Sequence, residues 1–170
     1  MGINMITYEW IFNTDYDFSG IGLIKDALTK YFCTPTNLNV FASLGVDGVH
    51  FGVLKGHKNP PVYVIDPWSA SYVEPISENF EDFLSMLLTL KNANFFTFIS
   101  GSSKEEFLKI CDEDPIPDEL PELIYLSKLV YKKYASLEDV YLAVKKIQSN
   151  IELKKCLKYS DEFYSVTGME

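Results

Sequence analysis

The sequence contains no arginine: all 15 basic residues are lysines, set against 24 acidic residues, and the formal net charge is -9. Proteins that bind DNA or RNA depend on arginine side chains and on a positive field along the phosphate backbone. The composition therefore argues against a nucleic-acid partner. An acidic surface keeps a protein soluble, and it would also steer a basic protein towards this chain.

Cysteine and histidine are also scarce. Cys33, Cys111 and Cys156 are far apart, no Cys-x-x-Cys occurs, and only two histidines accompany them. This pattern predicts free, buried thiols rather than disulfides or a zinc site, and it is typical of a reducing compartment. We expect a cytoplasmic protein without a metal or cofactor.

Long apolar runs are missing. No stretch approaches the ~18–20 residues that cross a bilayer, and the first ten residues lack the features of a signal peptide. We therefore expect no membrane association. With 170 residues, 47% of them hydrophobic and 15% aromatic, the chain is long enough to bury a core. We predict a single domain over 1–170.

Three apolar runs in the middle of the chain predict strands at 47–54, 61–66 and 72–76. The first is entered through the turn dipeptide Asp47-Gly48. The second carries bulky residues on both faces, which favours a central strand, and Pro75 in the third suits an edge or a bulge. The segment 8–12 is expected to be an edge strand, whereas 38–44 fits either a strand or a helix.

Apolar spacing and capping residues predict helices in the rest of the chain. Asn79 is an N-cap for the strongest of them, and Ser103 and Ser136 begin two others. The remaining helices are expected at about 20–32, 120–131 and 151–157, with frayed residues after Ser160. Strands grouped in the middle predict an α+β fold, with a sheet-containing core over about 1–100 and a helical C-terminal extension over about 101–170. One core should contain Val49, Phe51, Val62, Val64, Phe83, Leu84 and Leu87.

His50 is the first candidate for chemistry. It could act as a general base or metal ligand, oriented by Asp47 and Asp66, in a pocket near His50 and Asp66. Alternatively, it is a structural histidine that hydrogen-bonds a neighbouring turn. One histidine makes a poor metal site, no nucleophile accompanies it, and no phosphate-binding loop or nucleophile elbow occurs. The sequence therefore predicts no catalytic residue.

Two further features suggest a protein partner. Trp68 follows a predicted strand, where it could anchor a partner or cap the core. The segment 112–122 holds six acids, three prolines and no lysine. It is either a solvated connection between helices or an acidic face for a basic protein. The candidate partner-binding residues are Trp68, Asp112, Glu113, Asp114, Asp118 and Glu119.

The middle third of the chain resembles a branch of the SUKH superfamily. The resemblance is carried by Phe41-Ala-Ser-Leu-Gly-Val-Asp-Gly-Val-His-Phe-Gly-Val-Leu54, by Pro61 to Pro67 and by Val73 to Leu84, and it covers roughly 38–100. The family often has two glycines where Gly45-Val46 stands. It includes fungal cell-wall assembly regulators and many bacterial immunity proteins that neutralise polymorphic toxins. The resemblance implies a central, largely antiparallel sheet surrounded by helices.

Two functions follow as hypotheses. The first is a non-enzymatic binding protein, an immunity protein of a polymorphic toxin system that occludes a basic toxin domain. The second is a small-molecule-binding sensor or a small enzyme with its pocket beside His50 and Asp66. For either, we expect a monomer or a weak homodimer.

Overall fold

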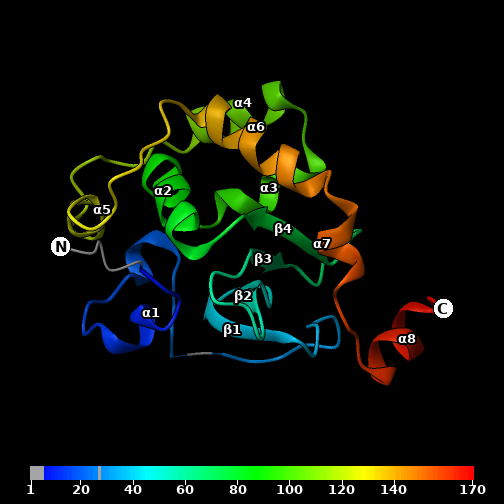
Figure 1. Cartoon of the computed structure of the whole chain (residues 1–170). Coiled ribbons are helices and arrows are strands. Elements are labelled where there is room, and N and C mark those ends of the chain that lie inside the picture. The colour runs from blue at the N-terminus through cyan, green and yellow to red at the C-terminus, as the bar shows by residue number, and fades with distance from the viewer. Residues whose placement is uncertain (1–5, 27) are drawn as a thin grey trace.

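The structure is a computed structural model that describes residues 6–26 and 28–170. At its centre is a four-stranded sheet in the order β1-β2-β3-β4, in which each strand is antiparallel to its neighbours. Helices surround this sheet, which confirms the predicted α+β class (Figure 1). The strands are β1 (Leu38–Ser43), β2 (His50–Leu54), β3 (Val62–Ile65) and β4 (Val73–Ser77). The undecided segment 38–44 is thus a strand.

The two faces of the sheet pack into separate apolar clusters, because successive side chains of a strand point to opposite sides. On β3, Val62 and Val64 belong to the larger cluster, whereas Tyr63 and Ile65 belong to the smaller one. The central position predicted for this strand is confirmed. All seven predicted core residues lie in the larger cluster and are at most 5% exposed: Val49, Phe51, Val62, Val64, Phe83, Leu84 and Leu87.

Strand β4 forms one edge of the sheet and contains a bulge. The register with β3 shifts between Val62, which is opposite Ser77, and Tyr63, which is opposite Pro75. Proline lacks the N–H that a ladder needs, so it is tolerated at an edge and beside a bulge. The position predicted for Pro75 is confirmed.

Most helices begin at a side-chain cap. Asn79 accepts the N–H of Asp82 at 2.9 Å, Ser103 and Glu106 form a reciprocal capping box, and Ser136 accepts the N–H of Asp139 at 3.1 Å. These predicted starts are confirmed. The helices are α1 (Trp10–Asn13), the 3₁₀ turn η1 (Ser19–Ile21), α2 (Phe80–Leu90), α3 (Phe95–Gly101), α4 (Lys104–Glu113), α5 (Pro121–Ser127), α6 (Leu137–Gln148), α7 (Ile151–Lys155) and α8 (Asp161–Thr167).

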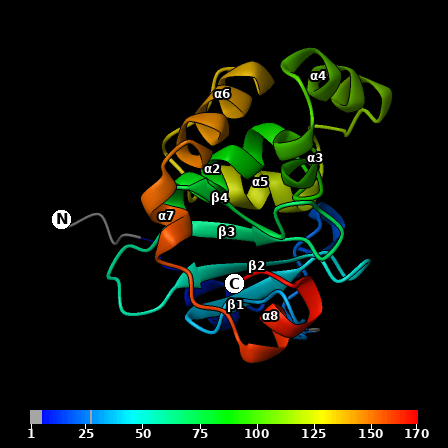
Figure 2. The ribbon, with the colours of Figure 1, turned by 90° about the vertical axis from the view of Figure 1, so that its right-hand side faces the viewer.

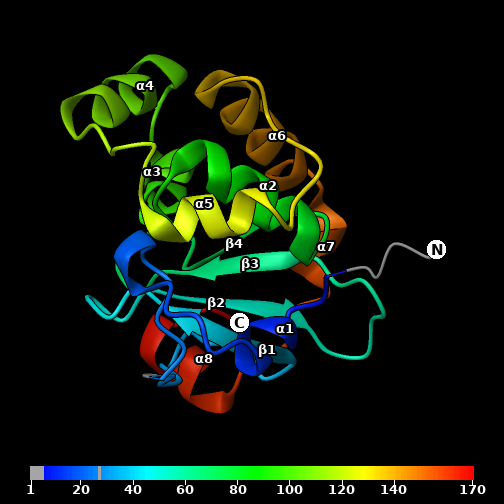
Figure 3. The same cartoon turned by 90° about the vertical axis from the view of Figure 1, so that its left-hand side faces the viewer.

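The larger cluster joins the sheet to α2 and α3 through packed phenylalanine rings. Phe83 of α2 lies 5.3 Å from Phe96 of α3 and 5.7 Å from Phe51 of β2, between ring centroids. Figure 2 shows α8 in front of β1 and β2, and Figure 3, from the opposite side, shows α1 and α5 in the foreground. The C-terminal and N-terminal segments therefore lie on opposite sides of the sheet.

The C-terminal segment is ordered against the sheet, so the expectation that residues after Ser160 are frayed is wrong. Ser160 caps α8, and Phe163 packs into the smaller cluster with 4% of its surface exposed. Tyr63 of β3 donates a hydrogen bond to the carbonyl of Leu153 at 2.9 Å, and Asn37 donates to the carbonyl of Cys156 at 2.9 Å. These bonds fix the segment to the sheet before α8 begins.

The helix predicted over about 20–32 is also wrong. Gly22 has a φ of +78°, which ends η1 after one turn. Ile24 then pairs with Ser43 of β1 through two backbone hydrogen bonds of 2.9 Å. Apolar residues at spacings of three and four are present here, but pairing with the sheet satisfies the backbone better than a helix that contains glycine.

The segment 8–12 is not an edge strand, because α1 begins at Trp10. Ile11 is buried and Phe12 is 45% exposed, while Trp10 stacks on the Tyr125 ring of α5 at 6.4 Å. The alternation of bulky residues over five positions was too short to distinguish a strand from one helical turn. Helix α5 is also shorter than predicted: it ends at Ser127, and residues 128–136 form a turn and an irregular connection to α6.

Candidate functional site

Trp68 lies in the loop between β3 and β4 and is 80% exposed. It therefore does not cap the core, which was one of its two interpretations. Its backbone N–H donates to Oδ1 of Asp66 at 2.9 Å, and its indole Nε1–H donates to the carbonyl of Asp47 at 2.9 Å. The first bond orders the backbone within the Trp68 loop, and the second, to the β1–β2 loop, orients the exposed indole.

The loop that accepts the hydrogen bond of the Trp68 indole is the connection between β1 and β2. It is closed by the N–H of Leu44, which donates to the carbonyl of Val49 at 3.0 Å. Asp47 and Gly48 both have positive φ, +54° and +72°, as tight hairpin loops require. A side chain at Gly48 would come within 2.7 Å of the Tyr31 ring. The turn predicted at Asp47-Gly48 is therefore confirmed, and the carbonyl of Asp47 in this turn accepts the hydrogen bond of the Trp68 indole.

Tyr72 closes the Trp68 loop in a strained backbone conformation. Its φ is +59°, a region that costs a residue other than glycine roughly 1–3 kcal/mol. The carbonyl of Tyr72 accepts the N–H of Asp66 at 2.8 Å, and its ring packs on Phe32 at 5.5 Å and on Phe163 at 5.8 Å. Helix α8 therefore supports the loop that carries Trp68.

A cavity of about 700 Å³ lies beside Trp68. The described residues that line it include two carboxylates, Asp47 and Asp66, and no lysine or histidine. Trp68 and Val46 contribute exposed apolar surface, 80% and 61%. The full lining is Ser19, Gly22, Leu44, Val46, Asp47, Val49, Asp66, Trp68, Asn92, Asn94, Thr97 and Phe98. The cavity is thus acidic and partly apolar, and it unites Trp68 with two of the three residues predicted for a pocket.

The contacts of His50 favour the structural interpretation over the chemical one. It is 1% exposed, its Nδ1 bonds the carbonyl of Gly48 at 2.7 Å, and its Nε2 bonds the Thr34 hydroxyl at 2.9 Å. Neither bond involves Asp47 or Asp66, so the expected carboxylate orientation is wrong. Burial lowers the pKa of His50, against the opposing effect of the Gly48 carbonyl, and favours the neutral ring.

Two of the three cysteines are buried, and all three are free thiols. Burial raises the pKa of Cys33 to about 11 and that of Cys111 to about 11 as well. At neutral pH both are therefore protonated, and a protonated thiol is a weak nucleophile. This favours a structural interpretation of both residues.

The acidic segment occupies the end of α4 and the connection to α5. Its predicted residues are exposed, and two of them form ion pairs: Asp118 with Lys91 at 2.7 Å and Glu113 with Lys109 at 3.7 Å. The last turn of α4 carries no basic residue. Negative charge at a helix C-terminus opposes the helix dipole, at a cost of a few tenths of a kcal/mol. Glu113 is partly compensated by Lys109 on the same helix, whereas Asp112 is not explained by local helix stability.

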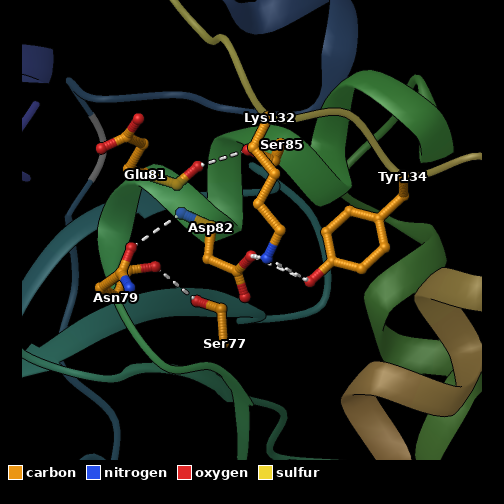
Figure 4. A network of polar contacts seen from close by, with 7 residues as sticks. All are labelled: Ser77, Asn79, Glu81, Asp82, Ser85, Lys132 and Tyr134. Carbon is orange, nitrogen blue, oxygen red and sulfur yellow. Dashed lines mark hydrogen bonds and ion pairs between the residues drawn. The ribbon is translucent and has the colours of Figure 1, made fainter.

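A second cavity, of about 540 Å³, lies where α2, α6 and the 128–136 connection meet. Figure 4 shows the polar network on its wall: Lys132 pairs with Asp82 at 2.7 Å, and the Tyr134 hydroxyl donates to the same carboxylate oxygen at 2.9 Å. Burial and this hydrogen bond raise the pKa of Tyr134 to about 12, so it remains a phenol. The network holds the 128–136 connection against α2, and the positive charge of Lys132 balances the negative charge of Asp82.

Within residues 6–26 and 28–170, no group of three or more His, Cys, Asp or Glu side chains is arranged to hold a metal ion. None of the helices in that part of the chain is both long and apolar enough to span a membrane. Comparison with known proteins gives no matching family model, no matching curated protein and no matching solved structure.

Sequence reasoning found Trp68, Asp47 and Asp66 but did not connect them. The contact between Trp68 and Asp47 joins two hairpin loops, and no local pattern encodes it. Lys132 and Tyr134 were missed altogether, because their partner Asp82 is 50 residues away in the chain. The only local signal was that a tryptophan stood in a polar loop beside an aspartate.

Proposed function

We propose that this chain is a non-enzymatic cytoplasmic protein that binds and occludes a basic protein domain, as an immunity protein of a bacterial polymorphic toxin system does. The observation that carries the proposal is Trp68, which is 80% exposed yet fixed by hydrogen bonds from two loops. Tryptophan is the residue most enriched among the side chains that dominate protein interfaces. Fixing it before binding reduces the entropy lost on association.

Charge supports a basic partner. The chain carries a net charge of -9, and two aspartates, Asp47 and Asp66, line the cavity beside Trp68. The acids at the end of α4 are placed against the helix dipole, which is the kind of local conflict that functional surfaces retain. An acidic surface accelerates the association of a basic domain. An anchor such as Trp68, which the partner would bury, mainly sets the dissociation rate of the complex.

The resemblance of residues 38–100 to the SUKH superfamily gives this proposal its sharper form. The segments that carry it contribute to β1 to β4 and to the start of α2, and they include Asp47 and Asp66, which bond Trp68. Trp68 itself lies between two of these segments. An immunity protein of this kind would mask the toxin without chemistry of its own, and it would act as a monomer or a weak homodimer.

The experiment uses a basic toxin domain encoded by a gene adjacent to this one. Purified full-length protein should bind that domain as a stable complex and abolish its toxicity at equimolar amounts. A toxin domain that stays fully active in the presence of excess protein, with no complex detected by calorimetry, would refute the proposal. The matched control is an unrelated basic protein of similar size and charge, which should bind at least tenfold more weakly at physiological salt, a difference of about 1.4 kcal/mol.

The alternative function is a small-molecule sensor that uses the cavity beside Asp66. A volume of about 700 Å³ is within the range of ligand pockets. His50 does not line this cavity, so the sensor would depend on Asp47, Asp66 and Trp68 instead. A small molecule that co-purifies with the protein and is lost in Trp68→Ala would favour this alternative.

A further inference from the structure

We infer that the cavity between the Trp68 loop and the β1–β2 loop receives an arginine side chain of the partner, and this inference rests on the proposed function. The occupant would place its guanidinium against the indole of Trp68 and near the carboxylates of Asp47 and Asp66. This cavity combines the two exposed loops with both acids.

The lining explains why the occupant is a cation. Asp47 and Asp66 contribute two negative charges, and no lysine or histidine is among the described residues that line the cavity. The remaining polar groups include the side chains of Ser19, Asn92 and Thr97, whose oxygens can also accept hydrogen bonds. A cation that enters would therefore meet acceptors and no competing positive charge.

The indole explains why arginine fits better than lysine. Trp68 uses its Nε1–H for the Asp47 carbonyl, so the ring presents its π face rather than its donor to an incoming group. A guanidinium is planar, weakly hydrated and able to stack on an aromatic ring while its N–H groups bind a carboxylate. A lysine ammonium is more strongly hydrated and makes only point contacts.

The chain cannot supply this occupant itself. The 170 residues contain no arginine, so no segment of this sequence, in the same copy or in a second one, could insert a guanidinium into the cavity. The loops are also fixed before binding, because Asp66 holds the backbone of Trp68 and Tyr72 closes the turn behind it. An arginine occupant must come from outside this sequence, in agreement with the basic partner proposed above.

The test uses single-residue probes and needs no partner. N-acetyl-arginine amide is titrated into the full-length protein, and the indole N–H resonance of Trp68 is followed by NMR, with that of Trp10 as the internal control. N-acetyl-citrulline amide, the neutral isostere, and N-acetyl-lysine amide are titrated in the same way. Trp68→Phe assigns the resonance by its absence.

The arginine probe should shift the Trp68 resonance and saturate in the millimolar range, with citrulline at least about fivefold weaker. Asp66→Asn keeps an oxygen for the Trp68 N–H but removes the charge, and it should weaken the arginine probe by about threefold or more. Glu105→Gln removes one charge at an exposed position of α4 that does not line the cavity, and it should leave the affinity unchanged. Trp10 should not respond.

The inference is overturned if Trp68 shows no shift up to about 50 mM arginine probe. It is also overturned if citrulline or lysine binds as tightly as arginine, or if Asp66→Asn binds the probe like the wild type. These results concern the cavity alone. A failure of the toxin domain to bind the whole protein would instead refute the proposed function, so the two failures can be told apart.

Discussion

The indole nitrogen of Trp68 lies 2.9 Å from the carbonyl oxygen of Asp47, and this hydrogen bond joins the two hairpin loops of the candidate binding surface. It connects residues 21 positions apart and fixes a side chain that is 80% exposed. A single exposed apolar residue is common on protein surfaces and needs no special role. Trp68 differs because a hydrogen bond to another loop orients its indole. The predictions below test the core that supports this surface, the charges around it and the anchor itself.

The packing of α2 on the sheet predicts a large loss of stability on truncation of Phe83. This side chain is fully buried against Phe51 and Phe96. Phe83→Ala should lower the free energy of unfolding by about 3–5 kcal/mol, measured by urea denaturation. The control is Tyr131→Ala at a position 79% exposed, which should change it by no more than about 0.5 kcal/mol. Equal effects of the two substitutions would contradict the assigned core.

Helix α8 should support both stability and binding. Phe163 is buried and packs on Tyr72, whose strained backbone closes the Trp68 loop. Phe163→Ala should therefore lower the free energy of unfolding by about 3 kcal/mol and also speed dissociation of the partner domain. Tyr164→Ala, at a position 42% exposed on the same helix, serves as the control. If Phe163→Ala lowered stability without changing the dissociation rate, α8 would not be coupled to the loop.

The buried neutral His50 makes stability depend on pH. Its pKa is lowered by burial from an ordinary value of 6.5, so the unfolded chain takes up a proton at a pH where the folded chain does not. The contribution of His50 to stability is therefore complete above the unfolded pKa and declines as the pH falls through about 6.5 towards the folded pKa.

The measurement is the free energy of unfolding between pH 7.5 and pH 5.5 in about half-unit steps, a window above the ordinary carboxylate pKa values. His50→Gln should have lower stability at pH 7.5 and a flatter pH profile than the wild type. His57→Gln, at an exposed loop position, should retain the wild-type profile. A His50→Gln protein with an unchanged pH slope would contradict the account of this residue.

The acidic segment should act on the rate of association. Asp118 and Glu113 are partly neutralised by lysines, so the sharper test is the triple reversal of Asp112, Asp114 and Glu119 to lysine. Stopped-flow association with the basic toxin domain should slow, and its salt dependence should flatten, because such attraction is screened over ~8 Å at physiological salt. Stability should change little, since all three are exposed. A wild-type association rate at every salt concentration would make this segment only a connection between helices.

The sequence predicts those parts of the fold that local chemistry determines. Asn79, Ser103 and Ser136 begin helices because their side chains satisfy the first free N–H groups, and this needs no distant partner. The strand at 62–65 was recognisable because both of its faces carry bulky apolar residues. The core predicted around Phe83 and Val64 followed from these elements.

The predictions that proved wrong failed because contacts between distant parts of the sequence determine these segments. Residues 20–32 have a helical spacing, but Ile24 pairs with Ser43 of β1 instead. Residues after Ser160 were predicted to fray because they end the sequence, but Phe163 packs into the smaller cluster beside Tyr72. The candidate site shows the same limit. The sequence singled out Trp68, Asp66 and Asp47 as separate candidates, but only the fold shows that their two loops are in contact.

The central claim is that Trp68 anchors a protein partner, and its most direct test is the dissociation rate of the complex with the adjacent toxin domain. Trp68→Ala should dissociate at least about 30 times faster than the wild type, as expected for an anchor worth 2 kcal/mol or more. Its free energy of unfolding should fall by no more than about 1 kcal/mol, because only one hydrogen bond is lost. Tyr131→Ala, at an equally exposed aromatic position, should dissociate at the wild-type rate. If Trp68→Ala and Tyr131→Ala both released the partner at the wild-type rate, Trp68 would not be the anchor and the proposed surface would be wrong.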